Sequence, residues 1–194
     1  MKALDFNVAK MDYLISEIIK EFDEGRPVII PTDTLYGLAC PISNHYCLEK
    51  IFELKSRPYD MTLPVSVGDI KSITIVAVPD GRIMEYIEGK LPGPYTFVIN
   101  ARPDLPEMIT REGKVAVRIP DHPLFRPLCE KAGPLALTSA NIHGEDPVGS
   151  FEDAREQFGE KGLLMIIDEG NVSGLRSEIV DLTEVEPMLI RDRR

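Results

Sequence analysis

Apolar residues recur along this chain with two alternating spacings. Near the N-terminus they fall three or four positions apart, as at Met11, Leu14 and Ile18, which predicts a helix with Asn7 as its N-cap and Gly25 beyond its end. Short apolar runs bounded by turn residues predict strands instead. We expect helices at 8–22, 45–54, 83–91, 123–132 and, from a cap at Ser150, through 158. We expect strands at 27–30, 63–67, 95–99, 115–119, 135–137, 163–167, 179–182 and 188–190.

The order of these elements predicts the fold class. Strands and helices alternate for much of the length, and adjacent strands follow near the end, which favours an α/β domain with a mixed sheet. A length of 194 residues fits one domain, and no internal repeat, low-complexity tract or linker divides it. We therefore expect a single domain over 1–194.

Charge and cysteine content narrow the choice of partners and compartment. The net charge is −10, which disfavours extended nucleic-acid binding unless cations gather in one place. Cys40, Cys47 and Cys129 form neither a CxxC pair nor a zinc spacing, which favours a reduced protein. The N-terminus lacks the apolar stretch of a signal peptide, and no apolar run is long enough to span a bilayer. We expect a cytoplasmic protein without a membrane anchor.

Common catalytic motifs are missing from the sequence. It contains neither G-x-x-x-x-G-K-[ST] nor G-x-G-x-x-G, and it has no HExxH. Its histidines, His45, His122 and His143, form no metal-ligand pattern, so we expect no protein-bound metal. A missing phosphate-binding loop does not exclude ATP, because cationic side chains can hold phosphates.

Cations and hydroxyls stand beside the expected strand and helix ends. The cations are Lys55, Arg57, Lys114, Arg118 and Arg191, and the polar turns are PTDT at 31–34, TSAN at 138–141 and GLRSEIVD at 174–181. Ligands of α/β proteins tend to bind where strand ends open into loops. If these segments converge, an acidic protein gains a localised cationic pocket.

Each of these residues also has an ordinary structural explanation. Lys55 in the last turn of a helix gains about 0.3–1 kcal/mol from the helix dipole. Arg118 could end a surface strand, and Ser139 and Asn141 could cap a turn. Thr32 and Thr34 fit an ordinary hydroxyl turn, with Asp33 solvated. Taken one at a time, these explanations are the more economical.

Taken together, the segments match a known family. PTDTLYGLACPISNHYCLEKIFELKSRP resembles the opening signature of the YrdC-like, or TsaC-type, threonylcarbamoyl-AMP synthases. VAVRIPDHPL, ALTSANIHGEDP, SEIVDL and LIR match later motifs in the same order, so the resemblance runs from about residue 8 to 191. It implies a single YrdC-like domain with a twisted, largely antiparallel mixed sheet and helices around one deep cationic cavity.

The resemblance also implies an activity. Members condense L-threonine, bicarbonate or CO2, and ATP into L-threonylcarbamoyl-adenylate and release pyrophosphate. Mg²⁺ accompanies the ATP. A partner enzyme, the tRNA threonylcarbamoyl transferase, then uses the adenylate to make threonylcarbamoyladenosine in tRNA. No covalent enzyme intermediate is needed, and the cysteines lie outside the matched motifs.

Site residues follow from the same match. Lys55 and Arg57 correspond to the K-x-R pair that faces the ATP phosphates, and we expect both to face the cavity rather than the core. Asn141 and Arg191 match nucleotide-contacting positions. The positions that hold threonine correspond to Thr34, Arg118, Ser139 and Ser177.

Some positions depart from the family pattern. Arg176-Ser177-Glu178 stands where Pro-Ser-Thr is usual, Met61 lies in a segment that often reads Asn-Pro-Leu, and Asp192 and Arg193 follow the terminal strand arginine in place of a glycine-containing ending. Successive strand residues face opposite sides. With Ser177 facing inward, we expect Glu178 to face away, with Arg176 on its outward side.

Three other interpretations remain open. LPGPYTFVI resembles the YciO paralogue branch as much as the synthase branch. YrdC-like proteins also resemble double-stranded RNA binders in cavity shape and charge, although the net charge and the lack of a basic run disfavour direct RNA binding. The carbamoyl-transfer modules of hydrogenase maturation proteins carry further domains and zinc-finger cysteines that are missing here.

Overall fold

A computed structural model describes residues 2–59, 61–159 and 165–193 of the chain. In this part the helices are α1 (Met11–Asp23), α2 (His45–Lys55), α3 (Gly81–Glu88), α4 (Phe125–Ala132) and α5 (Phe151–Phe158), with 3-10 turns η1 (Val8–Lys10) and η2 (Lys71–Ile75). The strands are β1 (Lys2–Asp5), β2 (Val28–Ile30), β3 (Gly37–Pro41), β4 (Val65–Ser66), β5 (Tyr95–Asn100), β6 (Thr110–Arg111), β7 (Lys114–Arg118), β8 (Leu135–Ser139), β9 (Met165–Asp168), β10 (Glu178–Asp181) and β11 (Met188–Arg191).

One mixed sheet joins all of the described strands. Its order is β1-β9-β2-β3-β8-β4-β7-β5-β10-β11, and β6 pairs with β7. Most of the pairings, including β2–β3, β3–β8 and β5–β7, are antiparallel, while β1–β9, β9–β2, β4–β7 and β5–β10 are parallel. The predicted single-domain α/β fold with a mixed, largely antiparallel sheet is confirmed.

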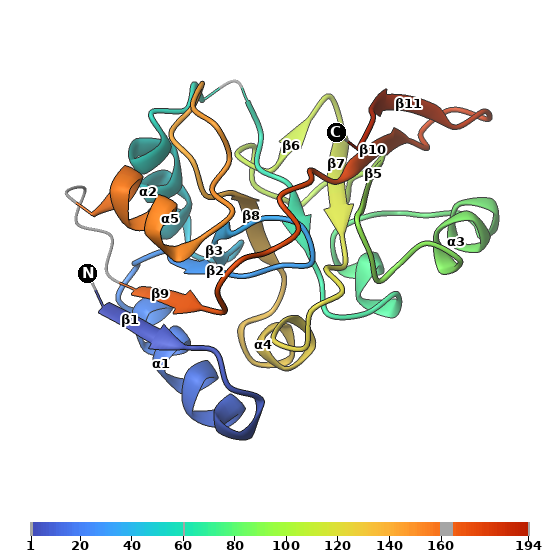
Figure 1. The fold of residues 1–194 in the computed structure, drawn as a ribbon. Helices are drawn as coiled ribbons and strands as arrows, with labels where there is room; N and C mark the ends of the chain where they lie inside the picture. Colours follow the sequence, from blue (N-terminus) through green and yellow to red (C-terminus); the bar gives the residue numbers. More distant parts are fainter. Residues whose placement is uncertain (1, 60, 160–164, 194) are drawn as a thin grey trace.

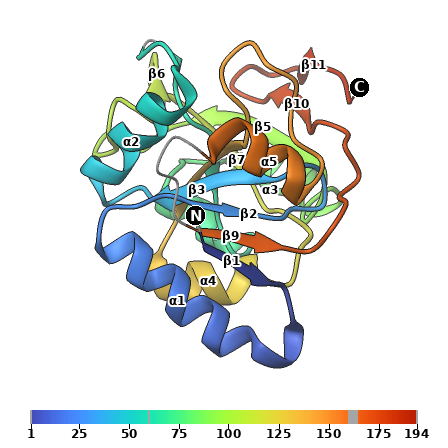
Figure 2. The same cartoon turned by 60° about the vertical axis from the view of Figure 1, so that its left-hand side comes forward.

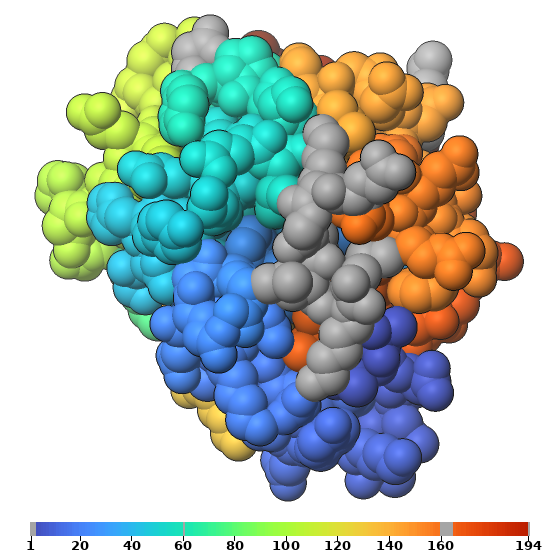
Figure 3. All heavy atoms as spheres, turned by 90° about the vertical axis from the view of Figure 1, so that its left-hand side faces the viewer, coloured from blue at the N-terminus to red at the C-terminus, as the bar shows by residue number. Residues whose placement is uncertain are grey.

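Helices cover both faces of one half of the sheet. In Figures 1 and 2, α1 and α4 lie together on one side of β1, β9, β2 and β3, and α2 and α5 lie on the other. Figure 3 views the molecule from the side of α1, in blue, and α2, in cyan. Helix α3 lies at the far end, beyond β5 and β10 (Figure 1). The longest described helix, α1, has 13 residues, and none of the described helices could span a bilayer.

Local sequence explains where the helices begin and end. Apolar spacing buries Leu14, Ile15 and Ile18 of α1 against the sheet, and Gly25, with φ +70°, follows its end. The Asn44 side chain accepts from the Cys47 backbone N–H at 3.0 Å and begins α2. Helix α2 ends at Lys55, and the next residue, Ser56, caps it in the left-handed conformation at φ 51°. This turn lets the chain leave the helix with Lys55 and Arg57 near each other.

The predicted elements are mostly present, with differences at specific places. Asn7 caps the short turn η1 rather than α1, with its side chain accepting from the Ala9 backbone N–H. The prediction did not include β1, β3, β6 or η2. Strand β4 is shorter than predicted, and α3 starts and ends earlier. The first two residues of the predicted strand 163–167 lie outside the described residues.

Candidate active site

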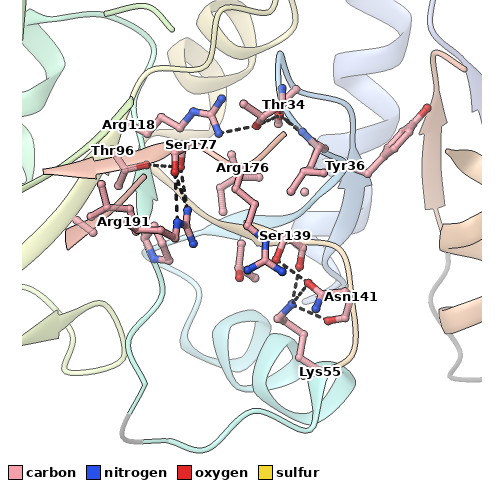
Figure 4. Close-up of a pocket in the computed structure, with 18 of the residues that line it drawn as sticks. Thr34, Tyr36, Lys55, Thr96, Arg118, Ser139, Asn141, Arg176, Ser177 and Arg191 are labelled. Carbon is pink, nitrogen blue, oxygen red and sulfur yellow. Dashed lines mark hydrogen bonds between the residues drawn. The ribbon is translucent and has the colours of Figure 1, made fainter. Parts of the chain in front are cut away.

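All eight predicted site residues line one cavity of about 540 Å³, a volume typical of a small-molecule site. They come from distant parts of the sequence and from the ends of several elements. They are Thr34, Lys55, Arg57, Arg118, Ser139, Asn141, Ser177 and Arg191. Figure 4 shows most of them with side chains directed toward the same space.

One face of the sheet forms the floor of the cavity. Six strands that follow one another in the sheet, from β3 to β10, each contribute lining residues. Some contributions are two residues apart, as with Ala116 and Arg118 of β7 or Leu137 and Ser139 of β8, although Thr138 between the latter two also lines the cavity. Alternation along a strand puts such pairs on the same face. Gly37 allows a close approach, because a Cβ there would lie 2.4 Å from a Leu137 methyl carbon.

Lys55 occupies one end of the cavity and connects α2 to the end of β8. Its side chain is only 2% exposed. The ammonium donates to the carbonyl oxygens of Ser139, at 2.5 Å, and Asn141, at 2.6 Å, and to Asn141 Oδ1 at 3.3 Å. Three acceptors use all three ammonium protons. The expectation that Lys55 faces the cavity rather than the interior is therefore only partly right, because it also holds the 139–141 loop in place.

The charge of Lys55 is sensitive to its surroundings. Burial, and secondarily the neighbouring Arg57, lower the pKa of Lys55 to about 7. Both causes disfavour the charged form of an ammonium. An anion in the cavity would act in the opposite direction and favour the protonated side chain.

Asn141 shapes the loop that follows β8. Its Oδ1 accepts from Ser139 Oγ at 2.6 Å as well as from Lys55. Its amide group donates to the carbonyl oxygens of Ile142 and Glu145 at 2.9 and 2.8 Å. The Asn141 side chain thus has its polar atoms engaged by the protein, and its contribution to the cavity is the shape of the 141–145 turn.

Arg57 retains part of its donor capacity for a ligand. Its Nε and Nη2 donate to the carbonyl oxygens of Met61 and Thr62 at 3.0 and 2.7 Å. Burial lowers the pKa of Arg57, although an arginine remains charged at neutral pH. No acceptor among the described residues takes an Nη1 proton of Arg57, and Arg57 is one of the residues that line the cavity.

Arg118 is fixed by the turn before β3. Its Nη1 donates to Thr34 Oγ1 at 2.8 Å, and its Nη2 forms an ion pair with Asp33 at 2.5 Å. Burial lowers the pKa of Arg118, and Asp33 opposes this shift by favouring the charged form. The Asp33 side chain is only 14% exposed, so the alternative in which Asp33 is a solvated turn residue does not hold. Asp33 Oδ2 and Arg118 Nε have no partner among the described residues.

Another pair of hydroxyl side chains, those of Ser177 and Thr96, lies where β5, β10 and β11 meet. Ser177 Oγ and Thr96 Oγ1 share a hydrogen bond of 2.9 Å. Arg191 Nη2 donates to the Ser177 carbonyl oxygen at 2.9 Å and to Ser177 Oγ at 3.2 Å (Figure 4). Thr96 was not singled out in the sequence. The sequence feature that could have identified Thr96 is its position near the start of a predicted strand. In the structure it lines the same cavity.

Two sequence expectations about charged residues are wrong. Lys114 does not line the cavity; it forms an ion pair with Asp181 at 3.2 Å. The reason is its place at the opposite end of β7 from Arg118, about 13 Å away along an extended chain. Arg176 does not share the outward side of Glu178, because it lines the cavity. It precedes β10, where strand alternation does not yet apply. Glu178 itself is not among the lining residues, as expected.

The charges of this cavity differ from those of the protein as a whole. Five cationic residues line it, against Glu145 and Asp146 on the acidic side. A protein of net charge −10 therefore has a cavity with a positive excess. Such a site suits an anionic ligand, and its hydroxyls suit a ligand that also hydrogen-bonds.

The family comparison agrees with this geometry. A family model for Sua5/YciO/YrdC proteins, described as "Telomere recombination", matches residues 20–192. The chain belongs to this family. Threonylcarbamoyl-AMP synthase of Vibrio campbellii is 29% identical over 85% of this chain and 92% of that protein. The family predicted from the motifs is therefore confirmed.

Solved structures place the fold within the same family. Pyrococcus abyssi Sua5, in complex with L-threonine, superposes with a TM-score of 0.89 at 30% identity over 98% of this chain. This chain spans 56% of that protein's length. E. coli YciO superposes with a TM-score of 0.87 at 22% identity over 98% of this chain and 94% of its own, a likeness of fold.

Proposed function

We propose that this protein makes L-threonylcarbamoyl-adenylate from L-threonine, bicarbonate or CO2, and ATP, and releases pyrophosphate. The observation that carries the proposal is the convergence of eight motif residues from separate segments on one cavity. The chain's family membership and the name of its Vibrio campbellii relative support the same activity. Binding of RNA alone is disfavoured by the net charge of −10.

The reaction joins two anions. The uncharged amine of threonine attacks CO2, forms a C–N bond and loses a proton, which gives a carbamate. A carbamate oxygen then attacks the α-phosphorus of ATP, and the bond to the bridging oxygen breaks, so that pyrophosphate leaves. Cations fixed around both reactants lower the barrier by positioning them and by offsetting their repulsion.

The threonine subsite is assigned to the Arg118 side of the cavity. Arg118 suits the threonine carboxylate, because it is held by Thr34 and Asp33 and still has N–H groups to donate. The hydroxyls of Thr34, Ser139 and Ser177 suit the amine and the side-chain hydroxyl. Thr96 holds Ser177 through their shared hydrogen bond.

The nucleotide subsite is assigned to the remaining lining cations. Arg57 and Arg191 have unused N–H groups for phosphate oxygens, while Lys55 contributes charge and holds the 139–141 loop. Asn141 shapes the turn on which the nucleotide rests. Among the described residues no cluster of three His, Cys, Asp or Glu could hold a metal ion, so Mg²⁺ would enter with the phosphates.

The product has a mixed anhydride bond and would be passed on quickly. We expect a tRNA threonylcarbamoyl transferase to take the threonylcarbamoyl group from the adenylate. The low affinity for RNA expected from the net charge fits an enzyme that releases a small intermediate rather than holding tRNA itself.

Pyrophosphate release provides the test. The purified protein is incubated with ATP, Mg²⁺, threonine and bicarbonate, and with mixtures that lack one of them. The proposal predicts release only in the complete mixture and a strong loss in Arg57→Ala. Release that does not depend on threonine would contradict it.

A further inference from the structure

Arg176 is a cationic residue that lines the cavity, and its guanidinium forms no hydrogen bond or ion pair with the described residues. Its side chain is exposed, and Figure 4 shows it directed into the space between Arg191 and Ser139. No described residue accepts a hydrogen bond from its guanidinium or forms an ion pair with it. Its five N–H groups therefore remain available.

The backbone on each side of Arg176 is anchored, which fixes where the side chain starts. Two residues earlier, the Gly174 backbone N–H donates to the Thr34 carbonyl oxygen at 2.9 Å. One residue later, Ser177 is held by Thr96 and Arg191. The segment that carries Arg176 is thus tied to both sides of the cavity, and its long side chain reaches inward from a defined point.

The other lining cations have already given part of their hydrogen-bonding capacity to the protein. Lys55 has three acceptors, and Arg57 uses its Nε and one terminal nitrogen. Arg118 uses both terminal nitrogens, and Arg191 uses Nε and one terminal nitrogen on Ser177. Arg176 is the described lining cation with the largest unused donor set.

Arg176 also adds a second positive charge next to that of Arg191. It lies close enough to Arg191 for its charge to help lower the pKa of that guanidinium, after burial. Glu145 and Asp146 line the same cavity, but neither forms an ion pair with Arg176. Two neighbouring guanidinium groups, neither of which forms an ion pair with a described carboxylate, favour a ligand that carries more than one negative charge.

We infer that Arg176 binds the polyphosphate of the nucleotide, together with Arg191 and Arg57. This assignment rests on the proposed function and adds a residue that the matched motifs do not include. Its exposed side chain can approach the phosphates after they enter, and its planar group can donate two parallel hydrogen bonds to a phosphate. Arg176 thereby supplies donors that Lys55, occupied by carbonyl oxygens, does not.

Calorimetric titrations of ATP, inorganic pyrophosphate and threonine test this inference. Arg176→Ala should weaken binding of ATP and of pyrophosphate by about tenfold, with threonine binding changed by less than about twofold. Arg176→Lys should lie between the wild type and Arg176→Ala, because it keeps the charge and loses the planar donor pair. The melting temperature should not change, since Arg176 makes no described contact.

Arg126→Ala is the matched control. It removes the same charge from an exposed position on α4, where Arg126 pairs with Glu130 away from the cavity. ATP or pyrophosphate affinity that stays within about twofold of wild type in Arg176→Ala, or that falls equally in Arg126→Ala, would overturn the inference. A wild type that binds ATP in an Arg176-dependent way but releases no pyrophosphate would refute only the proposed function.

Discussion

Asp33→Asn should destabilise the protein much more than its place in a polar turn suggests. The Asp33 carboxylate forms an ion pair with Arg118 at 2.5 Å, and the two side chains are only 14% and 10% exposed. Asparagine has nearly the same shape but no charge. The substitution therefore leaves the Arg118 guanidinium buried without a counter-ion, while its hydrogen bond to Thr34 remains.

The size of the effect follows from the burial of the pair. Removing one partner of a buried ion pair typically costs about 3–5 kcal/mol, because the other charge is left uncompensated. Some exposure remains and asparagine keeps one acceptor, so we expect a loss of about 3 kcal/mol in the free energy of unfolding. For a domain of this size, such a loss lowers the melting temperature by about 6–12 °C.

Urea denaturation of four proteins measures this effect: wild type, Asp33→Asn, Arg118→Met and the double variant. The double variant should be less destabilised than the sum of the single variants by about 2 kcal/mol, since both charges are then gone. Asp104→Asn is the control, because Asp104 pairs with Arg102 on the surface and should change stability by less than about 0.5 kcal/mol. Equal losses in Asp33→Asn and Asp104→Asn, or additive single effects, would refute the reasoning.

Three further predictions concern the pH dependence of ATP binding, the substitution of Glu178, and the choice of amino-acid substrate. Lys55 has a pKa lowered to about 7, so in the free protein it loses its charge as pH rises through that value. Bound phosphates would restore the proton, so ATP affinity should fall between about pH 7 and 9, with proton uptake seen by calorimetry in two buffers; a flat profile would contradict this. Glu178→Thr should change turnover little and stability by less than about 0.5 kcal/mol, as urea denaturation can check, because Glu178 does not line the cavity. Valine should be a poor substrate and serine a weak one in the pyrophosphate assay, whereas equal rates with valine would show that Ser139 and Ser177 do not read the hydroxyl.

Most of the fold could be predicted from local patterns, and each of the missed strands β3 and β1 has its own physical reason. Helices with strong apolar spacing, such as α1 and α2, were found close to their actual bounds. Strand β3 was missed because Gly37–Pro41 is short, buried throughout and rich in small residues, so it shows no alternation. Strand β1 was missed because its four residues gain their stability from pairing with β9, about 160 positions away.

The site was predictable as a set of residues but not as a set of contacts. Motif order identified the residues that meet in the cavity. It could not show that Lys55 is occupied by backbone carbonyl oxygens, since those oxygens belong to Ser139 and Asn141 on a distant strand end. It also could not show the pairing of Asp33 with Arg118, which depends on the arrangement of β3 and β7 in the sheet. Residue types indicate possible chemistry, whereas tertiary contacts decide which donors remain free.

Direct identification of the product tests the central claim. The protein is incubated with ATP, Mg²⁺, threonine and ¹³C-labelled bicarbonate, and the nucleotides are separated and measured by mass spectrometry. The account predicts an adenylate that contains both threonine and one labelled carbon, formed in step with pyrophosphate. ATP that is consumed without any adenylate carrying the labelled carbon would contradict it.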